Sequence, residues 1–185
     1  IELRRLDDGD EPDRCAANTR QFLGEGVFAL FGYIGTLTSA AALPLATEAR
    51  VPFFAPASGA EALRVPFNRY AIHVRASYQD ETAAIVRQII GTGIRKIAVF
   101  HQNDAYGKAG LEGVARALQA QNLAPVALGT AERGSVEVGK AVDDILAQRP
   151  EAIVQIGVYK ACAVFIRLAR ARGYTGNFYN VSMVG

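Results

Sequence analysis

The chain has 185 residues, of which 50% are hydrophobic and 21% are charged, so it can bury a core and is not a disordered segment. Its formal net charge is +2, and Lys and Arg are scattered among Asp and Glu without a basic run, which argues against nucleic acid as a partner. No apolar stretch approaches the roughly 20 residues that cross a bilayer, so we expect no direct insertion into a membrane.

Short apolar runs alternate with amphipathic stretches along the chain. Runs rich in Val, Ile and Phe are typical of strands that are covered on both faces, as in parallel sheets. They predict strands at residues 27–31, 52–54, 70–75, 97–100, 126–128 and 153–156. Apolar residues recur at helical spacing at residues 111–118, 138–146 and 161–168. This alternation predicts an α/β fold with doubly wound parallel sheets.

Several residues mark where the predicted helices begin and end. Pro12 suits the first turn of a helix, because its missing N–H would have no partner there. Asp104 and Ser135 are candidate N-caps, because their side-chain oxygens can accept a hydrogen bond from the first turn. Gly173 suits the left-handed position that follows the last turn of a helix.

The helix–strand rhythm is interrupted once, between about residues 52 and 78, where Pro and Gly punctuate loops and no helical spacing is visible. We interpret this stretch as a strand, a loop that faces a ligand, another strand and a crossover. The sequence therefore predicts two lobes, residues 1–75 and residues 76–185. The second lobe has clean helix–strand units throughout, whereas the first is incomplete at its N-terminal end.

One candidate anion site is formed by residues 32–39 (Gly-Tyr-Ile-Gly-Thr-Leu-Thr-Ser), directly after the first predicted strand. A strand that ends in Gly and hydroxyl residues and then enters a helix presents unpaired backbone N–H groups, and the helix dipole there favours a carboxylate. Alternatively, Thr36 or Thr38 only caps the helix. A phosphate-binding P-loop is excluded, because the Gly-Lys-Ser/Thr ending is missing.

Further candidate contacts follow other predicted strands. Residues 56–59 (Pro-Ala-Ser-Gly) are small enough to let backbone groups approach a ligand, or they form an ordinary turn. Tyr106 either places its ring at the mouth of the second lobe or is simply packed. Residues 158–159 (Val-Tyr) and 181–182 (Val-Ser) follow later strands, and the carboxyl ends of such strands face the binding crevice of doubly wound folds.

Patterns typical of enzymes and metal sites are weak or missing in the sequence. No Ser lies in a Gly-x-Ser-x-Gly elbow, and His73 and His101 are isolated, so both are expected to be structural. Cys15 and Cys162 lack metal-ligand spacing, and we expect two buried thiols rather than a disulfide. Residues 7–11 (Asp-Asp-Gly-Asp-Glu) suit a solvated turn before a helix better than a metal cluster. We therefore expect neither a cofactor nor a metal.

Seven short motifs occur along the chain in an order and spacing that are typical of a known family. They are residues 7–10 (Asp-Asp-Gly-Asp) after an opening strand, 31–36 (Phe-Gly-Tyr-Ile-Gly-Thr), 40–44 (Ala-Ala-Ala-Leu-Pro), 51–58 (Val-Pro-Phe-Phe-Ala-Pro-Ala-Ser), 75–78 (Arg-Ala-Ser-Tyr), 104–107 (Asp-Ala-Tyr-Gly) and 178–182 (Phe-Tyr-Asn-Val-Ser). Together they resemble the type I superfamily of periplasmic binding proteins, and most closely the leucine/isoleucine/valine-binding branch of ABC-transporter receptors. The resemblance covers essentially the whole chain.

This resemblance implies two lobes that close on a small ligand between them. In the first lobe, Thr36 matches the hydroxyl that holds the ligand carboxylate, and Ile34 lies beside the apolar part of the ligand. Ala57 matches a carbonyl that accepts from an amino group, and Gly59 matches an N–H that donates to the carboxylate. Ser58 lies between them in the same loop.

In the second lobe, Tyr106 matches a tyrosine at the cleft, and Val158 or Tyr159 matches a further aromatic contact. Ser182 stands where the amino-acid binders of the family have a Glu that pairs with the ligand's ammonium. Without that carboxylate, aromatic or aliphatic acids become more favoured ligands than branched-chain amino acids. Gly35 stands at a cysteine position, so the first-lobe disulfide of some relatives is missing.

The chain also lacks two parts of the family pattern. The opening strand and helix of the first lobe are missing, and so is a long C-terminal portion that returns to that lobe and completes the second. We therefore expect either a fragment of a longer protein or a neighbouring chain that fills the gap.

The function implied by the resemblance is that of the substrate-binding component of an ABC uptake transporter, without enzymatic activity. The expected partners are a small amino acid or other carboxylate and a membrane permease, with a hinge near residues 74–78. The expected location is the periplasm, or a lipid-anchored position outside the cell, and a signal peptide ahead of Ile1 would settle it. One alternative is the ligand-sensing core of a transcription regulator or receptor with the same fold. Another is a Rossmann or flavodoxin-like enzyme, but residues 91–93 (Gly-Thr-Gly) precede a strand instead of following one.

Overall fold

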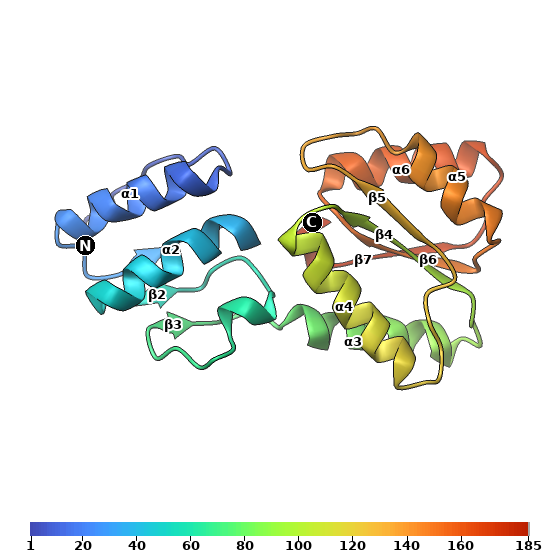
Figure 1. The fold of residues 1–185 in the computed structure, drawn as a ribbon, viewed down its shortest axis with the longest axis horizontal. Coiled ribbons are helices and arrows are strands. Elements are labelled where there is room, and N and C mark those ends of the chain that lie inside the picture. Colours follow the sequence, from blue (N-terminus) through green and yellow to red (C-terminus); the bar gives the residue numbers. More distant parts are fainter. Residues whose placement is uncertain (185) are drawn as a thin grey trace. The chain divides into compact units, whose positions relative to one another are not determined.

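The computed structural model describes residues 1–184 and divides into two compact units, one from Ile1 to Ser77 and the other from Tyr78 onward (Figure 1). Each unit is an α/β layer structure with its own parallel sheet. The predicted fold class is therefore confirmed. The boundary between the units lies shortly after residue 75, where the sequence placed the end of the first lobe.

The first unit, Ile1–Ser77, contains a small sheet with the strand order β1-β2-β3. All neighbouring strands are parallel, and Leu30 pairs with Phe53, which pairs with Ala71. In chain order the elements are α1 (Pro12–Gly24), β1 (Leu30–Phe31), α2 (Thr36–Ala49), β2 (Phe53–Phe54), the 3₁₀ turn η1 (Glu61–Leu63) and β3 (Ala71–Ile72).

Only one face of this sheet is covered. Leu30 and Phe53 are buried against α1 and α2, in a cluster with Cys15. On the opposite face, Phe31, Phe54 and Ile72 lie in register across the three strands and are 66%, 40% and 41% exposed. Parallel sheets are normally covered on both faces. No residue among 1–184 supplies that second cover.

The strands of the first unit are shorter than the sequence indicated. The predicted strand at residues 27–31 begins only at Leu30, because the N–H of Val27 donates to the carbonyl of Phe22 and closes a turn after α1. Residues 70–75 pair only at β3, and the carbonyl of Arg75, beyond its end, accepts a hydrogen bond from Arg64. Residues 1–8 form no strand.

The second unit contains a larger sheet with the strand order β5-β4-β6-β7, again all parallel. Its elements are α3 (Tyr78–Gly91), β4 (Ile97–Gln102), α4 (Ala105–Gln119), β5 (Leu128–Ala131), α5 (Gly139–Ala147), β6 (Ala152–Ile156), α6 (Tyr159–Ala171), β7 (Asn177–Asn180) and the 3₁₀ turn η2 (Ser182–Val184). The three helices predicted from apolar spacing correspond to α4, α5 and α6, and are confirmed. β5 begins two residues later than the predicted run, at Leu128, where pairing with Val99 starts.

Helices cover both faces of the second sheet, α3 and α4 on one and α5 and α6 on the other (Figure 1). The core on the α5–α6 side centres on Phe165, which stacks on Phe100 with ring centroids 4.4 Å apart. From β4 the chain moves outward to β5 and then returns to the other side of β4 to form β6. The connections after β4 and β6 therefore diverge, and a crevice at the carboxyl ends of these two strands is the usual ligand position in such sheets.

The capping predictions had mixed outcomes. Asp104 accepts a hydrogen bond from the N–H of Gly107 at 3.0 Å and caps α4, and Pro12 opens α1, as expected. Gly173 follows α6 with a positive φ of 86°, also as expected. The prediction for Ser135 was wrong. α5 begins later, at Gly139, and Ser135 instead accepts the N–H of Glu137 within the preceding turn.

Gly107 is required by the close approach of α4 to the end of β4. A Cβ at this position would lie 1.8 Å from the carbonyl oxygen of Gln102. We therefore predict that Gly107→Ala lowers the free energy of unfolding by at least about 3 kcal/mol, because the first turn of α4 must move away from the strand. Urea unfolding followed by circular dichroism measures this change.

Gly91→Ala is the matched control, because a Cβ on this helical glycine meets no atom within 4 Å. It should change stability by less than about 1 kcal/mol. Equal effects of the two substitutions would show that the tight contact at Gly107 is not real.

Candidate functional site

Parallel strands bring their carboxyl ends to one edge of each sheet, and every predicted ligand contact lies at such an edge. In the first unit the edge is made by residues 32–38, after β1, and residues 55–60, after β2. In the second unit it is made by residues 102–106, 157–160 and 180–182, after β4, β6 and β7. We call these groups the first-unit edge and the second-unit edge.

The two loops of the first-unit edge are tied together by their backbones. The N–H of Ala57 donates to the carbonyl of Tyr33 at 2.7 Å, and the N–H of Gly35 donates to the carbonyl of Ala57 at 3.3 Å. Ile34 and Ala57 thereby form an isolated parallel bridge beyond the ends of the strands. The Ala57 carbonyl keeps one lone pair. It can therefore still accept from a ligand amino group, whereas the Ala57 N–H is already used.

A pair of hydroxyls joins the same two loops. Thr36 Oγ1 and Ser58 Oγ lie 2.8 Å apart, and the two residues are 5% and 0% exposed. Ser58 Oγ also accepts the N–H of Ala60 at 3.2 Å. The pair has two hydroxyl protons and uses one of them in its own hydrogen bond. Whichever oxygen donates, one O–H proton remains for a ligand oxygen.

The amino end of α2 adds backbone donors to this edge. Gly35 is its N-cap, and no side chain caps the helix. The Thr38 hydroxyl donates backward to the carbonyls of Ile34 and Gly35, so the alternative that Thr36 or Thr38 serves as the N-cap is wrong. The N–H groups of the first turn and the positive end of the helix dipole thus remain available to an anion.

One carboxylate already lies close to this helix end. A Cβ built on Gly35 would lie 3.2 Å from Asp10 Oδ1 and 3.0 Å from Thr38 Oγ1. Gly35 also has a φ of 100°, which L side chains rarely adopt, so both space and backbone favour glycine. Because Asp10 repels a second anion, a ligand carboxylate is best placed on the side of the Thr36–Ser58 pair.

Two further predicted contacts complete the first-unit edge. Gly59 is buried, and its N–H has no hydrogen-bond partner among residues 1–184. Ile34 is 63% exposed and offers an apolar surface beside the donors. The structure therefore brings Ile34, Thr36, Ala57, Ser58 and Gly59 to one place, with donors for an anion and an apolar neighbour.

Tyr106 is a packed residue of the second-unit edge. It is only 6% exposed, its ring lies 5.4 Å from that of Tyr78, and burial raises its pKa. Its hydroxyl donates to the carbonyl of Gly157 at 3.2 Å, which links the loop after β4 to the loop after β6. The hydroxyl proton is therefore already used, and Tyr106 fixes the loops after β4 and β6 to each other.

Val158 and Tyr159 lie at the amino end of α6. Val158 is its N-cap, and no side chain caps this helix. Tyr159 is 60% exposed, and the ammonium of Lys160 lies 5.9 Å from the centre of its ring. Of the two residues, Tyr159 has the accessible aromatic surface.

Ser182 contacts a carboxylate that sequence reasoning missed. Its backbone N–H and its hydroxyl both donate to Glu81, the hydroxyl at 3.1 Å. Ser182 does stand at this edge, and Glu81 beside it supplies a carboxylate there. α3 leads into β4 from the opposite direction, so its first turn must lie at the carboxyl edge of the sheet. That topology was the signal that pointed to Glu81.

The remaining polar candidates have structural roles. His101 is buried and contacts the carbonyl of Gln102 through Nδ1, and His73 contacts the carbonyl of Leu63 through Nε2. Burial lowers the pKa of His73, and the nearby Arg64 adds to this effect. The carboxylates of residues 7 and 8 accept the N–H groups two residues ahead, as in the predicted turn. Among residues 1–184, no group of three or more His, Cys, Asp or Glu is arranged to hold a metal ion.

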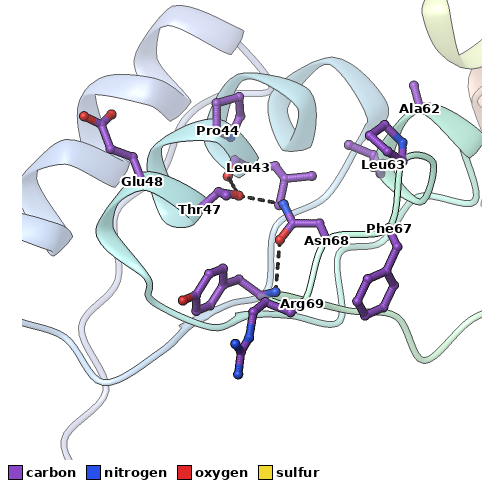
Figure 2. A pocket seen from close by; sticks show the side chains of 11 residues that line it. Leu43, Pro44, Thr47, Glu48, Ala62, Leu63, Phe67, Asn68 and Arg69 are labelled. Atoms are coloured by element: carbon purple, nitrogen blue, oxygen red, sulfur yellow. Dashed lines mark hydrogen bonds between the residues drawn. The ribbon is translucent and has the colours of Figure 1, made fainter.

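A separate cavity of about 630 Å³ lies elsewhere on the first unit (Figure 2). It is bordered by the second half of α2 and by the segment that precedes β3, so it lies away from the carboxyl edge. The amide of Asn68 spans it, donating to Thr47 Oγ1 at 2.6 Å and accepting the N–H of Tyr70 at 3.0 Å. None of the predicted ligand contacts lines this cavity.

The family model of the periplasmic binding proteins matches residues 1–185. The chain belongs to this family. It is a family of binding proteins rather than enzymes, and the resemblance predicted from the sequence is thereby confirmed. No curated protein sequence matches the chain significantly. Among residues 1–184, no helix has both the length and the apolar character that crossing a bilayer requires.

Solved structures give the same result. A possible leucine/isoleucine/valine-binding protein from Rhodopirellula baltica SH 1 is 36% identical, with a TM-score of 0.93, over 100% of this chain and 52% of the other. A substrate-binding periplasmic protein from Ralstonia solanacearum is 31% identical, with a TM-score of 0.88, over 96% and 51%. A fatty acid ABC transporter substrate-binding protein from Thermomonospora curvata, at 15% identity and a TM-score of 0.88 over 100% and 47%, shares the fold. The chain spans about half the length of these relatives.

Both cysteines are free and buried, as expected from the sequence. Burial raises the pKa of each thiol, Cys15 and Cys162, to about 12. At about pH 8 the reactive thiolate is then on the order of one part in ten thousand. We predict that neither thiol of the native protein reacts with Ellman's reagent within minutes.

Both thiols should react at once in concentrated guanidinium chloride, which serves as the control for reagent and protein. Rapid release of one equivalent from the native protein would contradict the burial of one cysteine, and Cys15→Ser or Cys162→Ser would identify which one.

Proposed function

We propose that the whole protein captures a small carboxylate-bearing solute for an ABC uptake transporter, and that the first-unit and second-unit edges bind the same ligand. The observation that carries this proposal is the set of hydrogen-bond donors at the first-unit edge. These donors, which no protein acceptor among residues 1–184 uses, come from the Thr36–Ser58 hydroxyl pair, the Gly59 N–H and the uncapped end of α2. Such a set suits an anion, and the family to which the chain belongs consists of binding proteins rather than enzymes. The role that we propose is therefore capture without chemistry.

In this mechanism the ligand carboxylate docks first on the donors of the first-unit edge. Ile34 contacts the apolar part of the ligand, and the second unit then closes over it by bending near residues 74–78. Tyr159 supplies exposed aromatic surface on the closing side. The closed form is what a membrane permease recognises. We infer a location in the periplasm or a lipid-anchored position outside the cell, and the family description, periplasmic binding protein, supports the first.

Support for the transport role comes from the relatives. The Rhodopirellula protein is described as a possible leucine/isoleucine/valine-binding protein, and the Thermomonospora protein as one that serves fatty acid transport. Both kinds of ligand carry a carboxylate and an apolar chain. These are the two features that the donors and Ile34 of the first-unit edge suit.

Thr36→Val tests the proposal, because it removes the hydroxyl and keeps the shape of the side chain. Titration calorimetry of the full-length protein with a panel of amino acids and with aromatic and aliphatic acids should find a ligand. The variant should bind that ligand at least about tenfold more weakly, since a hydrogen bond to a charged group is lost.

Thr47→Val is the matched control, because Thr47 lies on the same helix but borders the cavity of Figure 2. It should leave affinity within about threefold of the wild type. The proposal is wrong if no compound in the panel binds. If Thr47→Val abolishes binding while Thr36→Val does not, the ligand binds in that cavity instead.

A further inference from the structure

The segment that leads out of the first unit is held by side chains rather than by its own backbone. We call residues 73–77, between β3 and α3, the crossover segment, and all of it belongs to the first unit. The main chain of His73, Val74 and Ala76 makes no backbone–backbone hydrogen bond within residues 1–184. A segment without such hydrogen bonds moves easily unless side chains fasten it.

Two side-chain contacts attach the crossover segment to the end of η1. Arg64 Nη2 donates to the carbonyl of Arg75 at 2.8 Å and to the carbonyl of Ala76 at 3.2 Å. Nearer to β3, Nε2 of His73 lies 3.0 Å from the carbonyl of Leu63. Burial and the charge of Arg64 both lower the pKa of His73, so its ring is neutral at neutral pH and adds no second cation there.

The end of η1 is itself anchored, and it continues directly from the first-unit edge. Leu63 is 2% exposed and packs in the apolar cluster of the first unit. The N–H of Ala60 donates to Ser58 Oγ, which is also hydrogen-bonded to Thr36. A continuous set of contacts therefore runs from the proposed ligand donors to Arg64 and, through it, to the crossover segment.

The guanidinium of Arg64 is not used in an ion pair. No Asp or Glu among residues 1–184 lies within ion-pair distance of it, and its Nε is buried without a hydrogen-bond partner there. Burying part of a cation without a carboxylate costs free energy. The acceptors that the described residues offer this group are the two carbonyls of the crossover segment.

We propose that Arg64 fastens the crossover segment to the first unit, so that the bending that accompanies ligand capture takes place after Ala76 and not throughout residues 74–78. This inference rests on the proposed function, because capture requires the second unit to close. Arg64 is then a positioning residue of the hinge. By keeping the segment ordered before closure, it lowers the entropy that closure must remove.

The peptide bond between Arg75 and Ala76 reports on this contact directly. Trypsin cleaves after Arg, and the carbonyl of the cleaved bond must enter the oxyanion hole of the protease. In the native protein that carbonyl accepts from Arg64. We predict that Arg64→Gln raises the initial rate of cleavage after Arg75 in the full-length protein at least about tenfold, because a hydrogen bond from a charged group is lost. Mass spectrometry of the fragments identifies the cleaved bond.

Two further variants serve as controls. Arg69→Gln removes another arginine of the same unit, one that lies over the ring of Tyr70, and should leave cleavage after Arg75 within about threefold of the wild type. Arg64→Lys keeps a cationic donor and should restore protection to within about threefold. The wild type alone also tests the inference, since its initial cleavage after Arg75 should be slower than after the exposed Arg69.

A general loss of stability is distinguished by the other cleavage sites. If Arg64 only stabilised the first unit as a whole, Arg64→Gln would raise cleavage after Arg20 and Arg50, both exposed, as much as cleavage after Arg75. That result, or no faster cleavage after Arg75, would overturn the inference.

Calorimetry of the full-length protein tests the part of Arg64 in capture. With the best ligand of the panel described above, Arg64→Gln should bind at least about threefold more weakly, because closure must now order the crossover segment. Unchanged affinity in a variant whose segment is released would show that Arg64 does not direct the bending, and the inference would be wrong. If no compound binds to the wild type, the proposed function is wrong, and the role of Arg64 in capture fails with it, whereas the trypsin result still decides whether Arg64 holds the segment.

Discussion

The first-unit edge depends on the contacts that join two loops, one after β1 and one after β2. The hydrogen bond between Thr36 and Ser58 is buried, and the backbone bridge between Ile34 and Ala57 lies beside it. These contacts fix the loop after β1 against the loop after β2, although the strands themselves are only two residues long. Because the loops cannot separate without breaking a buried hydrogen bond, the hydroxyl proton, the Gly59 N–H and the end of α2 are held together before any ligand binds.

The second-unit edge is held by different contacts. Tyr106 links the loops after β4 and β6 by donating to the carbonyl of Gly157, and Ser182 donates to Glu81. The first-unit edge offers mainly donors, and the second-unit edge adds the carboxylate of Glu81.

The sequence was sufficient to predict the fold class and to predict which residues lie at the first-unit edge, because both follow from local patterns. Small and hydroxyl residues after an apolar run indicate a strand end, and parallel strands bring such ends to one edge. The strand limits and the cap at Ser135 were predicted less well, since they depend on tertiary contacts. Glu81 was missed because its partner lies 101 residues away, and no local pattern reports such a pair.

The central claim is that an anion binds at the carboxyl edge of the first sheet. Titrating the full-length protein with leucine and with 4-methylpentanoate, while following backbone amide chemical shifts by NMR, tests it most directly. The account predicts that, in the first unit, the largest changes occur at Thr36, Leu37 and Gly59, whose N–H groups gain a carboxylate partner. Changes concentrated at Asn68 and Tyr70, with Thr36 and Gly59 unmoved, would contradict it.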